Sequence, residues 1–400
     1  MVSDDGASKH FGKVDALVVG AGPAGLMAAE VLGRGGASVL VADAMPSVGR
    51  KFLMAGKSGL NLTKSESADD FFGSYRDLSP EMIAALKDFG PDDVMRWAED
   101  LGEPLFTGTS GRVFPVAMKA SPILRKWLMR LDGLGVERRT KWKWLGWEED
   151  SSRFSTPEGD VVVTPKITVL AMGGGSWARL GSDGAWVDKV EADTVAFQPS
   201  NVGLAVDWSP HVCALAGTPV KNTRMVAGGA ETRGEWVITN RGMEGGGVYD
   251  ICREVLDGSQ LKIDLVPDFP VSQITEKLKK PRGKESLGNY LRKTLGLGTA
   301  QRALLNEWGR PLPDGKELAK LMKALPAEIV GSLPTDEAIS TAGGVSWAAL
   351  DGFELTARKG VFCAGEMLAW DAPTGGYLLN GCLATGRSAG LAALSRLNEL

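Results

Sequence analysis

Two continuously apolar runs near the start of the chain flank a glycine-rich stretch, and this pattern carries the strongest secondary-structure signal in the sequence. Residues 16–19 and 39–42 contain no polar side chain, which is typical of strands in a parallel sheet that is covered on both faces. Between them, a glycine turn precedes a segment that begins at Pro23 and continues with small residues, which predicts a helix with proline in its first turn. The pattern therefore predicts a strand–helix–strand unit over residues 14–43.

The next part of the chain predicts helices and then a meander. Residues 80–102 have a helical pattern, and so do residues 121–131, where Ser121 is the expected cap and Pro122 the first helical residue. After Val136 the apolar period changes to two. This change predicts a three-stranded meander and a buried parallel strand, at residues 141–147, 153–155, 161–163 and 167–171.

The pattern of apolar and polar positions changes again between about residue 193 and residue 333. Short alternating segments at 202–206, 236–239 and 261–265 predict strands, and the polar stretch 271–330 predicts helices. Parallel-strand character returns at residues 360–364. The pattern therefore predicts an α/β protein in which one nucleotide-binding domain, built from both ends of the chain, is interrupted by an inserted substrate or cap domain.

The expected domain boundaries follow from these changes in the sequence pattern. They are a flexible leader at 1–13, a nucleotide-binding domain at 14–192 and 336–400, and an inserted domain at 193–335, β-rich at 193–265 and helical at 266–335.

Composition excludes several classes of partner. The net charge is −4 and the pI is near 5.5, so no surplus of Lys and Arg favours nucleic acid or anionic lipid. The first 13 residues have acids where a signal peptide has bases, and glycines and Pro23 interrupt the apolar stretch 16–32. We therefore expect a cytoplasmic protein with a small-molecule substrate, and the sequence does not decide its oligomeric state.

The numbers and positions of the cysteines and histidines disfavour a metal site and a catalytic triad that uses histidine. The four cysteines are far apart in the sequence, which disfavours a zinc site or a redox dithiol and predicts buried apolar roles. Only His10 and His211 are present, so a multi-histidine centre is nearly excluded. The chemistry is therefore expected to come from a cofactor.

The glycine turn fits a dinucleotide fingerprint. Residues 20–25 read G-A-G-P-A-G between a predicted strand and a predicted helix. In such a turn Gly20 permits the tight bend, Gly22 lets the backbone approach a pyrophosphate, and Gly25 lets helix and strand pack closely. Asp43 closes the second strand, where a carboxylate accepts hydrogen bonds from a ribose. The motif predicts a bound dinucleotide but does not separate NAD from FAD.

A second glycine run is a weaker candidate. Residues 173–178, G-G-G-S-W-A, formally fit G-x-G-x-x-A after a strand. Two more glycines, Gly181 and Gly184, stand where a helix would have to run, and no second ribose acid follows. A second dinucleotide domain is therefore not expected.

Several longer blocks resemble one family. The run G-R-K-F-L-M-A-G-K-S-G-L-N-L-T at 49–63, together with blocks at 111–115, 171–174, 239–245, 364–366 and 373–377, resembles the BaiN/aminoacetone-oxidase-like family of NAD(P)/FAD-dependent oxidoreductases. The resemblance spans nearly the whole chain. It implies a glutathione-reductase-type Rossmann-like FAD domain, interrupted by a β-rich domain with a helical insertion.

The resemblance also implies the residues that bind FAD without a covalent bond. Those expected at the pyrophosphate and adenosine are Gly20, Ala21, Gly22, Pro23, Ala24, Asp43, Ala44, Arg50, Lys51 and Ala171. Those expected towards the ribityl chain and flavin are Gly56, Asn61, Thr63, Gly365, Glu366, Gly375, Gly376, Tyr377 and Leu378.

The chain departs from the family pattern at three of these positions. Asp43 stands where Glu is usual, Ser58-Gly59-Leu60-Asn61 replaces a common Gly-Arg-Cys-Asn, and Leu378 replaces an Asn. Side-chain contacts of the replaced residues are not expected to carry over. The substrate of another branch of the family is not expected to carry over either.

The glycine turn at 373–376 is expected to begin a helix at Tyr377. Its free N–H groups would face the pyrimidine edge of the flavin, where a helix N-terminus stabilises negative charge. The two glycine turns of the chain would then serve opposite ends of one FAD.

Because flavin carries out hydride transfer itself, the enzyme needs no histidine base. The candidate catalytic residues are Tyr377, Arg179 and Arg241. The sequence favours an FAD-dependent oxidoreductase acting on a small organic substrate, with oxygen or NAD(P)H as the second redox partner. The alternative is a flavin-binding protein with a structural, regulatory or RNA-modification role.

Overall fold

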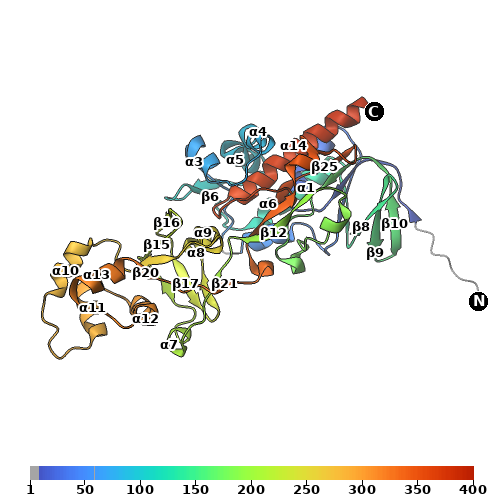
Figure 1. Ribbon diagram of the computed structural model, residues 1–400. Helices are drawn as coiled ribbons and strands as arrows, with labels where there is room; N and C mark the ends of the chain where they lie inside the picture. Colours follow the sequence, from blue (N-terminus) through green and yellow to red (C-terminus); the bar gives the residue numbers. More distant parts are fainter. Residues whose placement is uncertain (1–8, 58) are drawn as a thin grey trace, which may run out of the picture. The chain divides into compact units, whose positions relative to one another are not determined.

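The computed structural model describes residues 9–57 and 59–400 (Figure 1). The chain divides into two compact units. The first contains the chain up to Gln198 together with Ser340–Leu400, and the second is Pro199–Ile339. Each unit has its own cluster of buried apolar side chains.

The first unit is built on a seven-stranded sheet with the order β23-β24-β25-β11-β2-β3-β7. Its strands are β2 (Val14–Val19), β3 (Val39–Asp43), β7 (Glu137–Thr140), β11 (Pro165–Leu170), β23 (Leu350–Asp351), β24 (Glu354–Leu355) and β25 (Val361–Cys363). The strands from β25 to β7 are parallel, and β23 and β24 form an antiparallel edge. The prediction that both ends of the chain contribute to one parallel sheet is confirmed, because β25 pairs with β11 and β11 pairs with β2.

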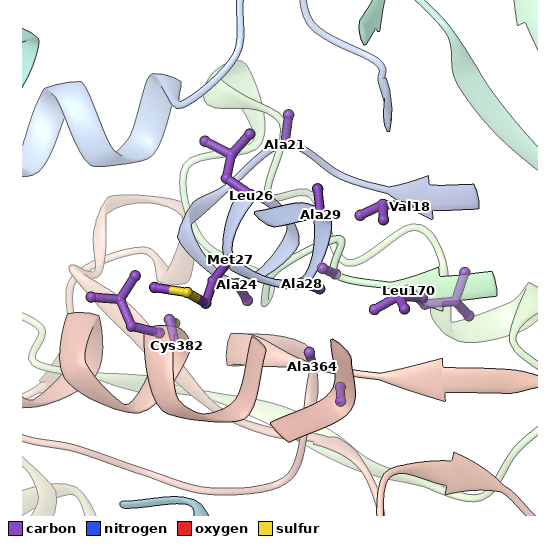
Figure 2. Packing of buried hydrophobic residues seen from close by; sticks show 14 of the residues in the cluster. Val18, Ala21, Ala24, Leu26, Met27, Ala28, Ala29, Leu170, Ala364 and Cys382 are labelled. Atoms are coloured by element: carbon purple, nitrogen blue, oxygen red, sulfur yellow. The ribbon is translucent and has the colours of Figure 1, made fainter. Parts of the chain in front are cut away.

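Two helices from opposite ends of the chain pack closely in this unit. They are α1 (Pro23–Arg34) and α14 (Tyr377–Glu399). A Cβ atom added at Gly386 would lie 2.3 Å from the carbonyl oxygen of Ala24, and one at Gly390 would lie 3.0 Å from the Cα of Ala28. In Figure 2, Ala24, Met27 and Ala28 lie on the side of α1 that faces α14, where Cys382 is found. Small residues on both helices therefore set their distance.

The predicted meander is present as an antiparallel sheet. It consists of β8 (Lys143–Glu148), β9 (Ser151–Thr156) and β10 (Gly159–Val163), joined by β1 (Lys9–His10). The prediction of a flexible leader up to residue 13 is wrong for its last residues. Lys9 and His10 pair in parallel with Val161 and Val162, and the Phe11 ring packs edge-on against Trp142 at 5.5 Å. The earlier part of the leader lies outside the described residues, as does Ser58.

The helices between β3 and β7 differ in detail from the prediction. They are α2 (Arg50–Ala55), α3 (Ala68–Gly73), α4 (Pro80–Asp88), α5 (Pro91–Asp100) and α6 (Ala120–Gly133). The helical pattern expected over 80–102 corresponds to two helices, α4 and α5, which are separated at Phe89 and Gly90, and Pro91 is the first residue of α5. The helix expected at Ser121 begins at Ala120 with Lys119 at the N-cap, so Ser121 lies inside the first turn.

Smaller elements complete the first unit. They are the sheet β4 (Thr63–Lys64), β5 (Leu105–Thr107) and β6 (Arg112–Pro115), the pair β12 (Thr194–Ser200) and β22 (Ser340–Val345), and the 3₁₀ turns η1 (Ala178–Leu180), η2 (Val187–Lys189), η4 (Trp347–Ala349) and η5 (Gly365–Met367). The second glycine run is followed by the short 3₁₀ turns η1 and η2, and in this part of the described chain no α-helix begins at the run.

The second unit combines two small sheets with helices. One sheet contains β13 (Leu204–Ala205), β14 (Pro219–Val220), β17 (Trp236–Thr239), β18 (Gly242–Glu244) and β21 (Gly331–Ser332), and the other contains β15 (Arg224–Ala227), β16 (Ala230–Thr232), β19 (Lys262–Asp264) and β20 (Leu325–Pro326). The helices are α7 (Pro210–Cys213), α8 (Gly246–Tyr249), α9 (Cys252–Leu256), α10 (Val271–Leu278), α11 (Leu287–Leu295), α12 (Thr299–Trp308) and α13 (Gly315–Lys323), and η3 is Thr335–Glu337. Asp264, 1% exposed, joins sheet and helices through contacts of 3.2 Å to Arg224 and 2.6 Å to Lys323.

None of the helices in the described parts of the chain has the length and apolar character that crossing a membrane requires.

Candidate functional site

A cavity of about 320 Å³ lies in the first unit, where the carboxyl ends of the parallel strands meet. Small-molecule sites span about 300–1,000 Å³ and occur at this edge of open α/β sheets. The cavity brings together the following predicted site residues: Gly20, Ala21, Gly22, Pro23, Ala24, Asp43, Ala44, Arg50, Lys51, Ala171, Gly365 and Glu366. Its wall also contains residues that the sequence did not predict, among them Met45, Trp142, Trp144, Ser182 and Lys189.

The three glycines of the fingerprint face different surroundings. Gly20 has φ +100°, and a Cβ there would lie 2.3 Å from the carbonyl oxygen of Ala171. A Cβ at Gly25 would lie 1.9 Å from the carbonyl oxygen of Gly20. These two glycines therefore serve the turn and the helix–strand packing. Gly22, in contrast, has no atom within 4 Å of its added Cβ and lines the cavity, which leaves an open cradle where a ligand can approach its backbone.

Asp43 ends β3 at the cavity wall. Its carboxylate accepts hydrogen bonds from the backbone N–H of Ala21 at 2.7 Å and of Met45 at 2.8 Å. Burial raises the pKa of Asp43 above its ordinary value of 3.8, and the two N–H donors and the nearby Arg50 oppose this shift. The fold therefore fixes an acceptor beside the glycine turn.

A buried ion pair closes another part of the cavity wall. Lys51 Nζ lies 2.7 Å from one carboxylate oxygen of Glu366 and donates a 3.0 Å hydrogen bond to Ser176. Glu366 also accepts the backbone N–H of Thr341. The pair joins α2, near the start of the chain, to η5, near its end, so Lys51 is not a free cation for a phosphate.

Arg50, a second cation in the cavity lining, retains free hydrogen-bonding capacity in the described chain. Its guanidinium contacts the hydroxyl of Ser47 at 3.4 Å, and no carboxylate pairs with it among the described residues. Its buried Nε lacks a partner within the same part of the chain. Since Arg50 lines the cavity, it can hold an anionic group there.

Of the residues predicted towards the ribityl chain and flavin, Gly365 and Glu366 line this cavity, and the others lie outside its lining: Gly56, Asn61, Thr63, Gly375, Gly376, Tyr377 and Leu378. The turn before α14 approaches β4 so closely that a Cβ at Gly376 would lie 2.6 Å from the Cα of Thr63. Thr63 donates its hydroxyl hydrogen to Asn380 at 2.7 Å. Asn61 Oδ1 and Thr374 Oγ1 are buried and lack hydrogen-bond partners in the described chain. A bulky residue at Gly376 would therefore disturb packing, whatever its effect on a bound flavin.

Tyr377 begins α14, as the sequence predicts. Its ring stacks on Phe71 at 5.2 Å, and its hydroxyl contacts Lys64 at 3.0 Å, Ser74 at 3.2 Å and the carboxylate of Glu66. Burial, together with the hydrogen bond to Glu66, raises the pKa of Tyr377. Tyr377 thus belongs to a polar cluster at the start of α14.

The three candidate catalytic residues have separate surroundings. Arg179 is exposed and lies over the ring of Trp177 at 4.9 Å. Arg241 belongs to the second unit, where it forms an exposed ion pair with Glu337. The partners of Tyr377 are in the first unit but are different from those of Arg179. Within the described first unit, Tyr377 and Arg179 therefore share no contact partner, and Arg241 has its ion pair in the second unit.

The residues of the cavity suit the diphosphate and ribose of a dinucleotide. The open cradle at Gly22, the N-terminus of α1, the unpaired Arg50 and the carboxylate of Asp43 supply the groups that such a ligand needs. This combination with a Rossmann-like sheet is typical of proteins that bind a dinucleotide. The chain belongs to the HI0933-like family of FAD-dependent oxidoreductases, since the model of the HI0933-like protein Rossmann domain matches residues 14–392. The resemblance to this family in the sequence blocks is thereby confirmed.

Relatives agree with this assignment. The chain is 26% identical to a 3-dehydro-bile acid delta(4,6)-reductase of Clostridium scindens, over 95% of this chain and 98% of that protein. Among solved structures, a 3-ketosteroid-delta4-(5alpha)-dehydrogenase of Rhodococcus jostii RHA1 is 17% identical with a TM-score of 0.51, and 98% of each chain is covered. Sdh1 of Mycobacterium smegmatis is 16% identical with a TM-score of 0.51, over 98% of this chain and 70% of that chain. The two structures show a shared fold.

Proposed function

We propose that this protein binds FAD non-covalently in the cavity of the first unit and transfers hydride between the flavin and a small organic substrate. The observation that carries the proposal is the cradle at Gly22, where an added Cβ would meet no protein atom, beside the partly buried carboxylate of Asp43 and an Arg50 guanidinium whose Nε has no partner in the described chain. Family membership supports the same cofactor. Flavin supplies the redox chemistry when bound.

The side chains of the cavity bind and orient the cofactor in this proposal. The N–H groups at the start of α1 and the guanidinium of Arg50 hold the diphosphate, and the carboxylate of Asp43 accepts hydrogen bonds from the ribose. The ion pair of Lys51 and Glu366 forms another part of the cavity wall. No histidine lines the cavity within the described chain, and in this proposal the named residues supply binding and polarity.

The reducing direction is the first to test. The relative from Clostridium scindens is a reductase, which supports NAD(P)H as the reductant and an organic acceptor as the substrate. The second unit, with its own core, is the proposed substrate domain. Its substrate is a small organic molecule whose identity we do not transfer from the relative.

Absorbance after gentle purification tests the proposal first. Flavin bands near about 370 and 450 nm, or their appearance with FAD added to the apoprotein, are expected. Absence of these bands together with no uptake of FAD would contradict it. Mixing the FAD-loaded protein with NADPH and then with NADH in a stopped-flow instrument tests the reductant. Bleaching by neither, with reduction by dithionite intact, would contradict the assignment of NAD(P)H.

Gly22→Ala tests the place of binding. The backbone of Gly22 (φ −80°, ψ −178°) suits alanine, and the new Cβ meets no protein atom. We therefore expect a folded protein whose FAD binding is weaker by about 1–3 kcal/mol, or about 5- to 150-fold, because the Cβ occupies the cradle. Gly12→Ala is the matched control, since its Cβ also meets no atom and Gly12 lies outside the cavity lining. Equal FAD affinity in both variants would refute the assignment of this cradle.

A further inference from the structure

A second cavity of the first unit adjoins the cavity proposed for FAD. Its volume is about 430 Å³, and it lies where the end of α2 meets the start of α6. Ser47, Arg50 and Leu180 line both cavities. The dinucleotide fingerprint does not account for the second cavity, because the described residues of its lining include none of the turn at 20–25.

A close contact between α2 and α6 brings two lysines to this second cavity. A Cβ at Gly56, the C-cap of α2, would lie 2.6 Å from the Cβ of Ala120, the first residue of α6. Lys57 directly follows Gly56, and Lys119 directly precedes Ala120. The contact therefore places the two lysines beside each other in the chain fold, and both line the second cavity.

The charged side chains of the second cavity all have one sign. Its lining includes Arg50, Lys57 and Lys119, and the described residues of the lining include no Asp or Glu. No ion pair between residues that the structure describes involves Lys57 or Lys119. Both lysines are exposed, so they can reach a ligand that enters from solvent. Because neighbouring cations repel one another, the arrangement favours an anion between them.

Lys119 also occupies a position that disfavours a cation. It is the N-cap of α6, its side chain caps no backbone N–H, and the first turn of the helix contains no acidic residue. Ser, Thr, Asp and Asn are preferred at an N-cap, and a positive charge there opposes the helix dipole. A residue that breaks a local rule without a gain in stability is expected at a functional site. An anion bound by Lys119 would offset this cost.

We propose that the second cavity binds the phosphate group of a ligand that reacts with FAD, either the reductant NADPH or a phosphorylated substrate. A phosphate monoester carries about two negative charges at neutral pH, so it suits two lysines better than a carboxylate does. Arg50 lines both cavities and can contact the FAD diphosphate as well as this phosphate. The identity of the reacting ligand rests on the proposed function, whereas the binding of phosphate does not.

Calorimetric titration of the FAD-loaded protein with inorganic phosphate, at constant ionic strength, tests the binding. Lys57→Gln should weaken phosphate binding about three- to tenfold, because it removes one charge-assisted contact. Lys119→Ser should weaken phosphate binding by a similar factor. It should also raise the unfolding midpoint measured without phosphate, because serine can cap α6. A purely structural role of Lys119 would not produce these opposite changes.

Lys87→Gln is the matched control. Lys87 is an exposed lysine of the first unit, in the last turn of α4, and it lines neither cavity. Its replacement changes the net charge by the same amount as Lys57→Gln does. The variant should keep the phosphate affinity of the wild type.

The nicotinamide dinucleotides distinguish the two sources of the phosphate. NADPH carries a phosphate monoester that NADH lacks, so the FAD-loaded proteins are mixed with each in a stopped-flow instrument. A wild-type preference for NADPH that Lys57→Gln and Lys119→Ser both lower about three- to tenfold would assign the phosphate to NADPH. No preference for NADPH, together with phosphate binding that depends on the two lysines, would assign it to the substrate.

Three results would overturn the inference. They are no binding of phosphate by the wild type, wild-type phosphate affinity in both Lys57→Gln and Lys119→Ser, and an equal loss in Lys87→Gln. If FAD binds and phosphate does not, the proposed function stands and only the phosphate site fails. If the wild type takes up no FAD, the proposed function fails, and the same titration of the FAD-free protein decides the phosphate site separately.

Discussion

The buried ion pair between Lys51 and Glu366 allows a quantitative prediction about the first unit. The side chains are 24% and 7% exposed, and they meet at 2.7 Å. Removing one partner of a fully buried pair costs about 3–5 kcal/mol, because the other charge is left in a poorly solvated place. Since Lys51 keeps partial contact with water, we reduce the expected cost to about 2–3 kcal/mol.

Lys51→Met should be the more damaging of the two single changes. It leaves the less exposed group, Glu366, with the backbone N–H of Thr341 as its remaining donor. Glu366→Gln leaves Lys51 with the hydroxyl of Ser176 and with solvent. For a unit of this size, 2–3 kcal/mol corresponds to a fall of about 5–10 °C in the unfolding midpoint.

A double-mutant cycle measured by urea and thermal unfolding tests the argument. The double variant Lys51→Met/Glu366→Gln should be more stable than the sum of the single effects predicts, by about 1–3 kcal/mol, since it leaves no unpaired charge. Lys279→Met is the control, because its ion pair with Glu276 is 68% and 72% exposed and should contribute about 0.5 kcal/mol or less. Additivity within about 0.5 kcal/mol would refute the claim that the two charges are coupled.

Three further predictions use other parts of the structure. Burial raises the pKa of Asp43 above 3.8, so the folded apoprotein binds a proton at this carboxylate more tightly than the unfolded chain does. The stability of the apoprotein should therefore fall, and its FAD affinity should rise, as the pH rises through the interval just above 3.8. Asp43→Asn should remove both trends in calorimetric titrations, and a pH profile unchanged by the substitution would contradict the role of Asp43 at the ribose. Gly386→Ala would place its Cβ 2.3 Å from the carbonyl oxygen of Ala24, so it should lower the stability of the first unit by about 1–3 kcal/mol and reduce its affinity for FAD. Gly133→Ala is the control: its Cβ has no atom within 4 Å, and it should change neither quantity. Asp264→Asn should destabilise the second unit by about 3 kcal/mol, which a lower protease resistance of residues 199–339 would reveal. The FAD content should stay that of the wild type. Loss of FAD without loss of stability would contradict a purely structural role of Asp264.

Much of the first unit could be predicted because its signals are local. The apolar runs of β2, β3 and β11 and the glycine turn before α1 depend on short stretches of sequence. The separation of α4 from α5 was missed, although Gly90 and Pro91 signal it, because the apolar pattern continues across them. The role of Lys9 and His10 in β1 could not be predicted, since it depends on pairing with β10 far along the chain.

The residues of the candidate site likewise include some that local sequence predicts and some that only the fold brings together. The residues at Gly20–Ala24 and Asp43 could be found from their spacing, and the structure gathers them around one cavity. The pairing of Lys51 with Glu366 was not foreseen, because it depends on how the two ends of the chain meet. The sequence patterns did not predict Trp142 and Trp144 as residues of the site. Their place in the cavity wall follows from the pairing of β7 with β3, which no local pattern reveals.

The sharing of one sheet by both ends of the chain has a consequence for how the protein is made. During synthesis β2, α1 and β3 leave the ribosome early, but β25 and α14 leave last. Until then the face of α1 that carries Ala24 and Ala28 lacks its neighbour α14, and β11 lacks one of its two parallel partners. The second unit, whose apolar cluster is formed within residues 202–338, can complete its core earlier. The cavity, whose lining includes Gly365 and Glu366, is therefore completed only after the second unit has been synthesised, and a chain that lacks α14 should expose the apolar surface of α1 and be subject to aggregation or degradation.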